Sequence, residues 1–248
     1  MTSPPHPPDQ RAGRQGAPPG AEVTLDASAM TTREINRSLQ ALPYGRALVT
    51  NPAGRHNLAV GLDAPVQVRI DGPAGCYAGG LGKRARVTVN GSAGVGVAEN
   101  LMSGDVHVRG SAGQSAAASA RGGVVVVDGG CSSYAGISLK GATLAIGGNA
   151  GAYCGYLAQS GVILIGGDAG PRLGDSLYEA VVYVGGRIAG LGSGAVVEEI
   201  DEHDVTFVKV LADECGFDHV SPASVTKVVS ARRLYQLQSR HHDDPGGY

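Results

Sequence analysis

The sequence predicts an all-β protein, a right-handed parallel β-helix, and three observations carry this prediction. Glycine accounts for 40 of the 248 residues, aromatic residues make up only 4%, and one residue pattern recurs every 19 residues. Each glycine inside a helix costs about 1 kcal/mol relative to alanine, which excludes a helical bundle. A repeat with a period near 20 residues is typical of a solenoid.

The repeat is defined by a column of glycines, which we interpret as structural corners. Seven of them follow one another at intervals of 19 residues: Gly72, Gly91, Gly110, Gly129, Gly148, Gly167 and Gly186. Aliphatic residues stand two and four positions before each glycine, so both side chains fall on one face of a strand. A Gly-x-Ala-Gly sequence begins at five of the seven glycines, and we expect positive φ or tight contacts between successive rungs there.

One rung of the predicted solenoid is therefore a short strand followed by corners. The roughly 14 residues left in each repeat are too few for a crossover helix, because a βαβ unit takes about 30 residues. The right hand follows from the general preference of parallel crossovers. About seven rungs of 19 residues result.

Both flanks of the repeat depart from its pattern and divide the chain. Residues 1–21 hold six of the 13 prolines, so we expect a disordered tail. The other segments are expected to be an N-terminal cap and lead-in (22–65), the β-helix (66–200), a C-terminal helical cap (201–241) and a loose tail (242–248).

Helices are expected in the caps, because the open ends of a solenoid need covering. Their predicted ranges are 31–39, 204–215 and 222–230. Thr31 and Glu34 have the spacing of a capping box at the start of the first helix. Apolar residues recur at helical spacing in the second, and Ser221 and Pro222 suit the N-cap and first position of the third.

Composition narrows the class of function. A net charge of −2 with few aromatic residues disfavours nucleic-acid binding. No apolar run approaches 18 residues and no signal-peptide pattern is present, so neither a membrane span nor export is expected. Four cysteines whose spacings form no metal-binding pair indicate a reduced, cytoplasmic chain.

Few residues suggest chemistry of their own. The glycine-rich stretch 190–194 resembles a dinucleotide-binding loop, but a strand pattern follows it instead of a helix, so we interpret it as a corner. His107 is expected to point outward, and no nucleophile and base stand together. Cys76, Cys131 and Cys154 are interpreted as packed small residues.

Two further groups of side chains have a structural and a functional interpretation. Tyr77, Tyr134 and Tyr153 occupy one column of the repeat and are expected to stack along the solenoid. Three cations form a small basic cluster, which is either a solvated face or a docking patch for an acidic partner: Lys83, Arg84 and Arg86.

The outward positions of the strands, five and three residues before each glycine, change along the chain. They are polar in the first three rungs and largely apolar in the last four. Six of the apolar residues are candidates for an interface: Val124, Val126, Val162, Leu164, Val181 and Tyr183. A contiguous apolar stripe of this size indicates a covered surface, either under a terminal helix of the same chain or under a partner subunit.

The motifs as a set resemble a known family. The rungs Gly-Gly-Asn-Ala-Gly (147–151) and Gly-Gly-Asp-Ala-Gly (166–170) are similar to those in the C-terminal domain of the glutamate synthase large subunit. So are the stretches 33–37 (Arg-Glu-Ile-Asn-Arg) and 55–62 (Arg-His-Asn-Leu-Ala-Val-Gly-Leu). The resemblance covers about 24–240. It implies a right-handed β-helix that holds an amidotransferase domain and a synthase domain with FMN and an iron–sulfur cluster, and that carries no catalytic residue itself.

This chain shows the β-helix alone, so it most resembles the free-standing β-helix subunit of split glutamate synthase-like enzymes, such as N-methylglutamate synthase (methylamine–glutamate N-methyltransferase). The resemblance implies no catalytic, cofactor-binding or metal-binding residue in this chain. It implies a glutamine amidotransferase-like subunit and an FMN-binding subunit, with FMN and an iron–sulfur cluster, as partners. The amino donor, ammonia or methylamine, stays open.

Other functions are compatible with a β-helix. One is a subunit of a different redox assembly, similar to formylmethanofuran dehydrogenase, and another is a self-polymerising filament. A stand-alone β-helix enzyme, such as an acyltransferase or a carbonic anhydrase, fits less well. Those enzymes have an 18-residue period, whereas this sequence has 19.

Overall fold

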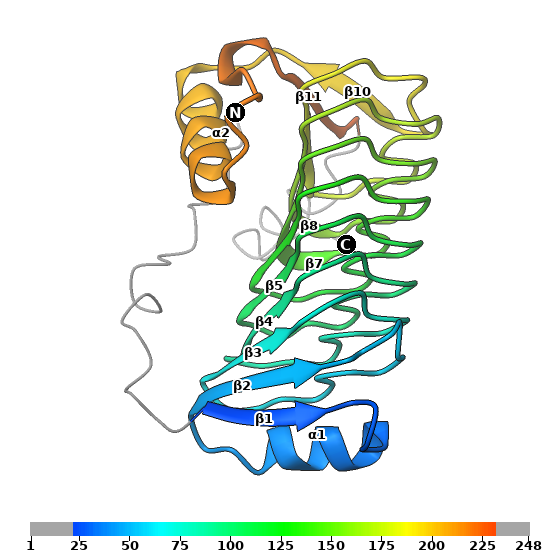
Figure 1. The fold of residues 1–248 in the computed structure, drawn as a ribbon. Coiled ribbons are helices and arrows are strands. Elements are labelled where there is room, and N and C mark those ends of the chain that lie inside the picture. Colours follow the sequence, from blue (N-terminus) through cyan, green and yellow to red (C-terminus); the bar gives the residue numbers. More distant parts are fainter. Residues whose placement is uncertain (1–21, 232–248) are drawn as a thin grey trace, which may run out of the picture.

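The computed structural model describes residues 22–231 and shows a β-solenoid (Figure 1). Eleven strands form one sheet in the order β1-β2-β3-β4-β5-β6-β7-β8-β9-β11-β10. The predicted tails, 1–21 and 242–248, lie outside the described residues, and so does the end of the predicted helical cap beyond residue 231.

The solenoid is built on seven strands, one for each predicted rung: β3 (Val66–Ile70), β4 (Arg86–Val89), β5 (Asp105–Val108), β6 (Val124–Val127), β7 (Lys140–Ile146), β8 (Ser160–Ile165) and β9 (Val181–Val184). Neighbouring strands pair in parallel, with Val87 opposite Val106 and Val106 opposite Val125. The offset is 19 residues in both pairs, which confirms the period of the sequence repeat.

The core is the column of inward side chains. All fourteen aliphatic residues two and four positions before the repeat glycines are buried, with at most 3% of any one exposed. Each contributes about 1.5–3 kcal/mol by leaving water. Because the same two positions are filled on every rung, the apolar columns hold the strands in one register.

Glycine is required at most corners because successive rungs pack closely there, and not because the backbone has positive φ. Only Gly72 among the seven has positive φ, 141°. A Cβ on Gly148 would lie 3.0 Å from the backbone of the rung before it, and one on Gly110 would lie 2.8 Å from the backbone N of Ser92. Close packing of successive rungs therefore excludes a side chain, and the alternative of positive φ holds only at the first corner.

Positive φ occurs instead five, seven and nine residues after the repeat glycine. In the rung after β6 these residues are Tyr134 (63°), Gly136 (68°) and Ser138 (52°). The same alternation recurs on the rungs after β3, β4, β5, β7 and β8, with Gly or Ala at the central position, but not on the rung after β9. On these rungs the alternation of positive and negative φ bends the second half of the rung without forming a helix.

The N-terminal segment extends the sheet by two strands. β1 (Glu22–Asp26) pairs with β2 (Gly45–Thr50), and β2 pairs with β3, all in parallel. Between them, α1 (Thr32–Gln40) lies across the end of the solenoid (Figure 1). Its capping box is confirmed, because the Thr31 N–H donates to Glu34 Oε2 at 2.7 Å and Thr31 Oγ1 accepts from the Glu34 N–H at 3.3 Å.

In the described part of the C-terminal segment, up to residue 231, one α-helix forms instead of the two helices expected. After β10 (Ala195–Glu198), α2 (Glu202–Cys215) confirms the helix predicted over 204–215. The helix predicted after Ser221 is wrong. One 3-10 turn (Pro222–Ser224) is followed by β11 (Thr226–Ser230), which lies antiparallel between β9 and β10. The β-branched sequence Thr-Lys-Val-Val favours a strand, and β9 offers it a free edge.

Candidate interaction surfaces

The outer face of the sheet has two halves with different composition. One outward position of the strands lies five residues before each repeat glycine. From β3 to β9 it is occupied in turn by Gln67, Arg86, Asp105, Val124, Thr143, Val162 and Val181. The change from polar to apolar falls between β5 and β6. We call β6–β9 the covered half and β2–β5 the open half.

The covered half lies beneath the chain's own C-terminal segment. Of the six interface candidates, Val162, Leu164 and Tyr183 are at most 3% exposed, and Val124, Val126 and Val181 are half-buried. Apolar residues of 208–225 join the buried candidates in one cluster: Val208, Leu211, Ala212, Phe217, Val220 and Val225. In the structure the first of the two alternatives holds, a terminal helix of the same chain.

The length of α2 matches the stripe that it covers. A helix of 14 residues is about 21 Å long. Four strands spaced about 4.8 Å apart span about 15–20 Å. The helix starts against Tyr183 on β9, and the loop that follows it reaches Gly147 at the end of β7. One helix therefore crosses most of the apolar rungs (Figure 1).

A buried polar network fixes the start of α2 to the sheet. The Tyr183 hydroxyl donates to Asp204 Oδ1 at 2.5 Å, and Lys227 Nζ donates to Asp204 Oδ2 at 3.1 Å. Lys227 also contacts Glu198 Oε1 at 2.8 Å. Asp204 completes the helix capping box by accepting from the Asp201 N–H. Strands β9 and β11 and the helix thus meet at the Asp204 carboxylate, and β10 joins them through the ion pair of Glu198 with Lys227.

Ionisation in this network follows its hydrogen bonds. Burial alone would raise the pKa of Asp204, but the bonds from Tyr183, the Asp201 capping box and Lys227 outweigh burial and lower it. For Lys227, burial lowers the pKa, and the contacts to Glu198 and Asp204 reverse this and raise it. Burial and then the bond to Asp204 raise the pKa of Tyr183. At neutral pH the buried Asp204 and Lys227 are both charged.

A second anchor holds the far end of the segment, and sequence reasoning missed it. The ring of His219 donates from Nε2 to the Gly147 carbonyl oxygen at 2.8 Å. A Cβ on Gly147 would lie 3.0 Å from Phe217, and one on Gly166 would lie 2.7 Å from His219. The outward position before the corner is Asp, Asn or Arg in the early rungs and glycine in the last three. This change from polar residues to glycine is the feature of the sequence that could have indicated a segment packed against the last rungs.

The open half carries charged pairs between adjacent rungs. Arg86 Nε lies 3.0 Å from Asp105 Oδ2. His107 Nε2 lies 2.6 Å from Asp128 Oδ1, and Arg109 binds the other oxygen of that carboxylate at 3.3 Å. His107 points outward, as expected, and contacts one carboxylate.

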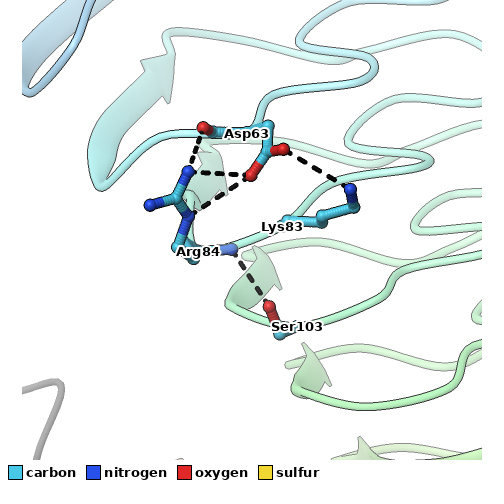
Figure 2. Close-up of polar contacts among 4 residues, drawn as sticks. All are labelled: Asp63, Lys83, Arg84 and Ser103. Carbon is cyan, nitrogen blue, oxygen red and sulfur yellow. Dashed lines mark hydrogen bonds and ion pairs between the residues drawn. The ribbon is translucent and has the colours of Figure 1, made fainter.

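The three cations of the predicted basic cluster are each paired with a carboxylate. Figure 2 shows Asp63 between Lys83 and Arg84, at 3.4 and 2.9 Å. The Arg84 N–H donates to Ser103 Oγ at 3.2 Å. Hydrogen bonding to Arg84 is the main cause that lowers the pKa of Asp63. These residues lie in corners, whereas Arg86 is on β4 and pairs with Asp105. Asp63, which the sequence analysis did not single out, offsets much of the positive charge of Lys83 and Arg84.

The tyrosines form a stack that is shorter than expected. Tyr134 and Tyr153 are parallel, with ring centroids 5.1 Å apart, and Tyr156 packs edge-on against both. Tyr77 is 44% exposed and lies three rungs from Tyr134. The predicted column is therefore occupied by stacked rings on two adjacent rungs.

The two buried cysteines, Cys131 and Cys154, are packed inside the solenoid as free thiols. Burial raises the pKa of Cys154 to about 12 and raises that of Cys131 as well, so both are protonated at neutral pH. They pack as small apolar residues, in agreement with the prediction, whereas Cys76, the third cysteine of that prediction, is only half-buried.

The stretch 190–194 is a corner, as expected, because β10 follows it and Leu191 bridges to Leu173 of the previous rung. Within residues 22–231, no group of three or more His, Cys, Asp or Glu side chains is arranged to hold a metal ion. No helix in the same range is long and apolar enough to cross a membrane.

Comparison with known proteins gives a partial relative. No protein-family model matches the chain. The chain is similar to Protein GlxC of Rhizobium meliloti (strain 1021), with 40% identity over 61 residues. The match covers 23% of this chain and 27% of the length of that protein.

Proposed function

We propose that this chain is a non-catalytic scaffold subunit of an FMN-dependent glutamate synthase-like complex, with N-methylglutamate synthase or a split glutamate synthase as the specific candidates. The observation that carries the proposal is the solenoid itself. Its 19-residue rungs and Gly-Gly-Asn-Ala-Gly and Gly-Gly-Asp-Ala-Gly corners are the features on which the resemblance to the glutamate synthase β-helix rests.

The packing of the interior supports a scaffold role. Aliphatic side chains fill the solenoid along every rung, with at most 3% of each exposed. The two thiols inside it are protonated at neutral pH. A rigid body of this kind acts through its outer faces, and function must be argued from those surfaces, not from the fold.

In the proposed complex the chemistry belongs to other chains. A glutamine amidotransferase-like subunit would release the amino group. An FMN-binding subunit with an iron–sulfur cluster would carry out the redox step. The similarity to Protein GlxC extends over 61 residues, and the proposal leaves the amino donor open.

The test is purification of the affinity-tagged chain from its source organism, with the same chain expressed alone as the control. We expect two further subunits to co-purify, together with flavin absorbance and iron. The chain expressed alone should contain neither flavin nor metal. A stoichiometric flavin, zinc or iron in the isolated chain, or a native complex without flavin, contradicts the proposal.

A further inference from the structure

The last strand of the sheet has an open edge. In the strand order, β10 follows β11 at the end of the sheet, and β10 pairs only with β11 among the described strands. Its central residues, Val196 and Val197, are 40% and 57% exposed. An edge strand with exposed β-branched residues is a template for the addition of another strand.

The hydrogen-bond pattern identifies which backbone groups face outward. The Ala231 N–H donates to the Gly194 carbonyl oxygen, so Gly194 and Ala231 are a hydrogen-bonded pair. In an antiparallel ladder such pairs alternate with pairs whose N–H and C=O groups point away from each other. Since Val196 lies opposite Val229 and Val197 opposite Val228, Val196 bonds to β11 and Val197 directs its N–H and C=O to the open edge.

Charge at this end of the solenoid indicates the kind of partner. Residues 181–231 contain eight Asp or Glu residues and three Lys or Arg residues, a net charge of −5, whereas residues 22–100 have a net charge of +2. Glu199 and Glu202, close to β10, are exposed and make no ion pair with the described residues. A second copy of the same edge would bring like charges together. The end of β11 lies along the edge of β10 that is already paired, so β11 does not occupy the open edge.

We infer that the open edge of β10 receives a strand from a partner subunit, with apolar side chains beside the two valines and basic side chains beside Glu199 and Glu202. The inference rests on the proposed function, because it names one surface by which the scaffold would hold a partner. The covered half is not available for this purpose, since α2 already occupies it.

The test uses the full-length tagged chain in its source organism and three variants of Val197. Val197→Pro removes an outward N–H without removing a β10–β11 hydrogen bond. Val197→Thr is the matched control, because it keeps the N–H and the β-branched shape. Val197→Lys keeps the N–H and adds a positive charge facing a basic strand, so it decides the matter if the proline variant does not fold. We expect at least about a tenfold loss of the co-purified subunit for Pro and Lys, and less than threefold for Thr.

Each outcome supports or overturns the inference. If a flavin-containing complex survives in Val197→Pro and Val197→Lys, the edge is not the docking site and the proposed function stands. If a complex without flavin is lost in these variants, the edge is supported and the proposed function fails. If no subunit co-purifies with the wild-type chain, both are overturned. A Val197 amide already protected from hydrogen exchange in the isolated chain, as a monomer or as a dimer, assigns the edge to this chain itself and overturns the inference.

Discussion

The covered half (β6–β9) and the open half (β2–β5) of the outer face belong to one sheet with one continuous parallel register, over the same apolar core. They differ in their outward residues. At the position three residues before the corner, β4 has Thr88 and β5 has His107, whereas β8 has Leu164 and β9 has Tyr183. The comparison shows that the inward columns determine the solenoid, and the outward columns determine what packs on it.

The largest expected effect comes from a charge placed under α2. Leu164→Arg puts a cation into a site that is 0% exposed, and we expect it to destabilise the protein by about 4 kcal/mol. Thr88→Arg introduces the same side chain in the same column of the open half and should change stability by less than about 0.5 kcal/mol. Urea unfolding followed by circular dichroism measures both. Equal losses would mean that the two halves do not differ.

The inner packing should be equally sensitive in both halves. Gly148→Val and Gly110→Val each place a Cβ within 3.0 Å of the previous rung, so each should cost about 3 kcal/mol through overpacking. Gly190→Val is the control, because nothing lies within 4 Å of its added Cβ. Thermal unfolding of the three variants checks this expectation. An unchanged melting temperature for Gly148→Val would contradict the rung register.

The polar network around Asp204 should stabilise the packing of α2 on the covered half, by less than the effects above. Asp204→Asn removes the charge that Lys227 and Tyr183 face, and we expect a loss of about 2 kcal/mol. Asp213→Asn, which breaks an exposed pair with Lys209 on the same helix, should cost less than about 0.5 kcal/mol. Unfolding free energies of the two variants give the comparison, and similar losses would show that the network contributes no more than a surface pair.

The same network gives the stability a pH dependence. Because the folded-state pKa of Asp204 is lowered, its contribution is present above the unfolded pKa of about 3.9 and is lost as the pH falls through the folded value. The raised pKa of Lys227 acts in the opposite direction, so its contribution is lost at strongly alkaline pH. In Asp204→Asn the difference in stability from wild type should therefore shrink on acidification. A constant difference between pH 7 and pH 3, measured by urea unfolding, would contradict this assignment.

The smallest effect is expected in the open half. Asp63 is exposed and its ion pairs with Lys83 and Arg84 are accessible to salt. Asp63→Asn should move the melting temperature by less than about 2 °C, and less still at 0.5 M NaCl. Differential scanning calorimetry at two salt concentrations measures this shift. A large decrease would mean that the corner pairs stabilise the rungs.

The repeat made most of the fold predictable from the sequence. A 19-residue period with two aliphatic columns fixes the strands, their parallel pairing and the buried face, because the same residues must meet on every rung. The capping box at Thr31 likewise acts within one turn of a helix, so local sequence determines it. These features depend on neighbours along the chain or one rung away.

The errors arose where contacts come from distant segments. Residues 226–230 were predicted as helical from the Ser221-Pro222 start signal, but β9 and β10 bind them as a strand. Lys227, which looks like a surface cation in the sequence, becomes buried only because Asp204 and Glu198 converge on it.

Hydrogen–deuterium exchange of the full-length chain, alone and in the complex purified from its source organism, tests the central claim most directly. The claim is that α2 closes the apolar half of the outer face in both states and that partners bind elsewhere. We predict that the amides of α2 and of β7–β9 exchange slowly and equally in both samples, while protection increases elsewhere on the chain. Faster exchange of α2 in the complex would show that a partner displaces the helix from the stripe, and would contradict the account.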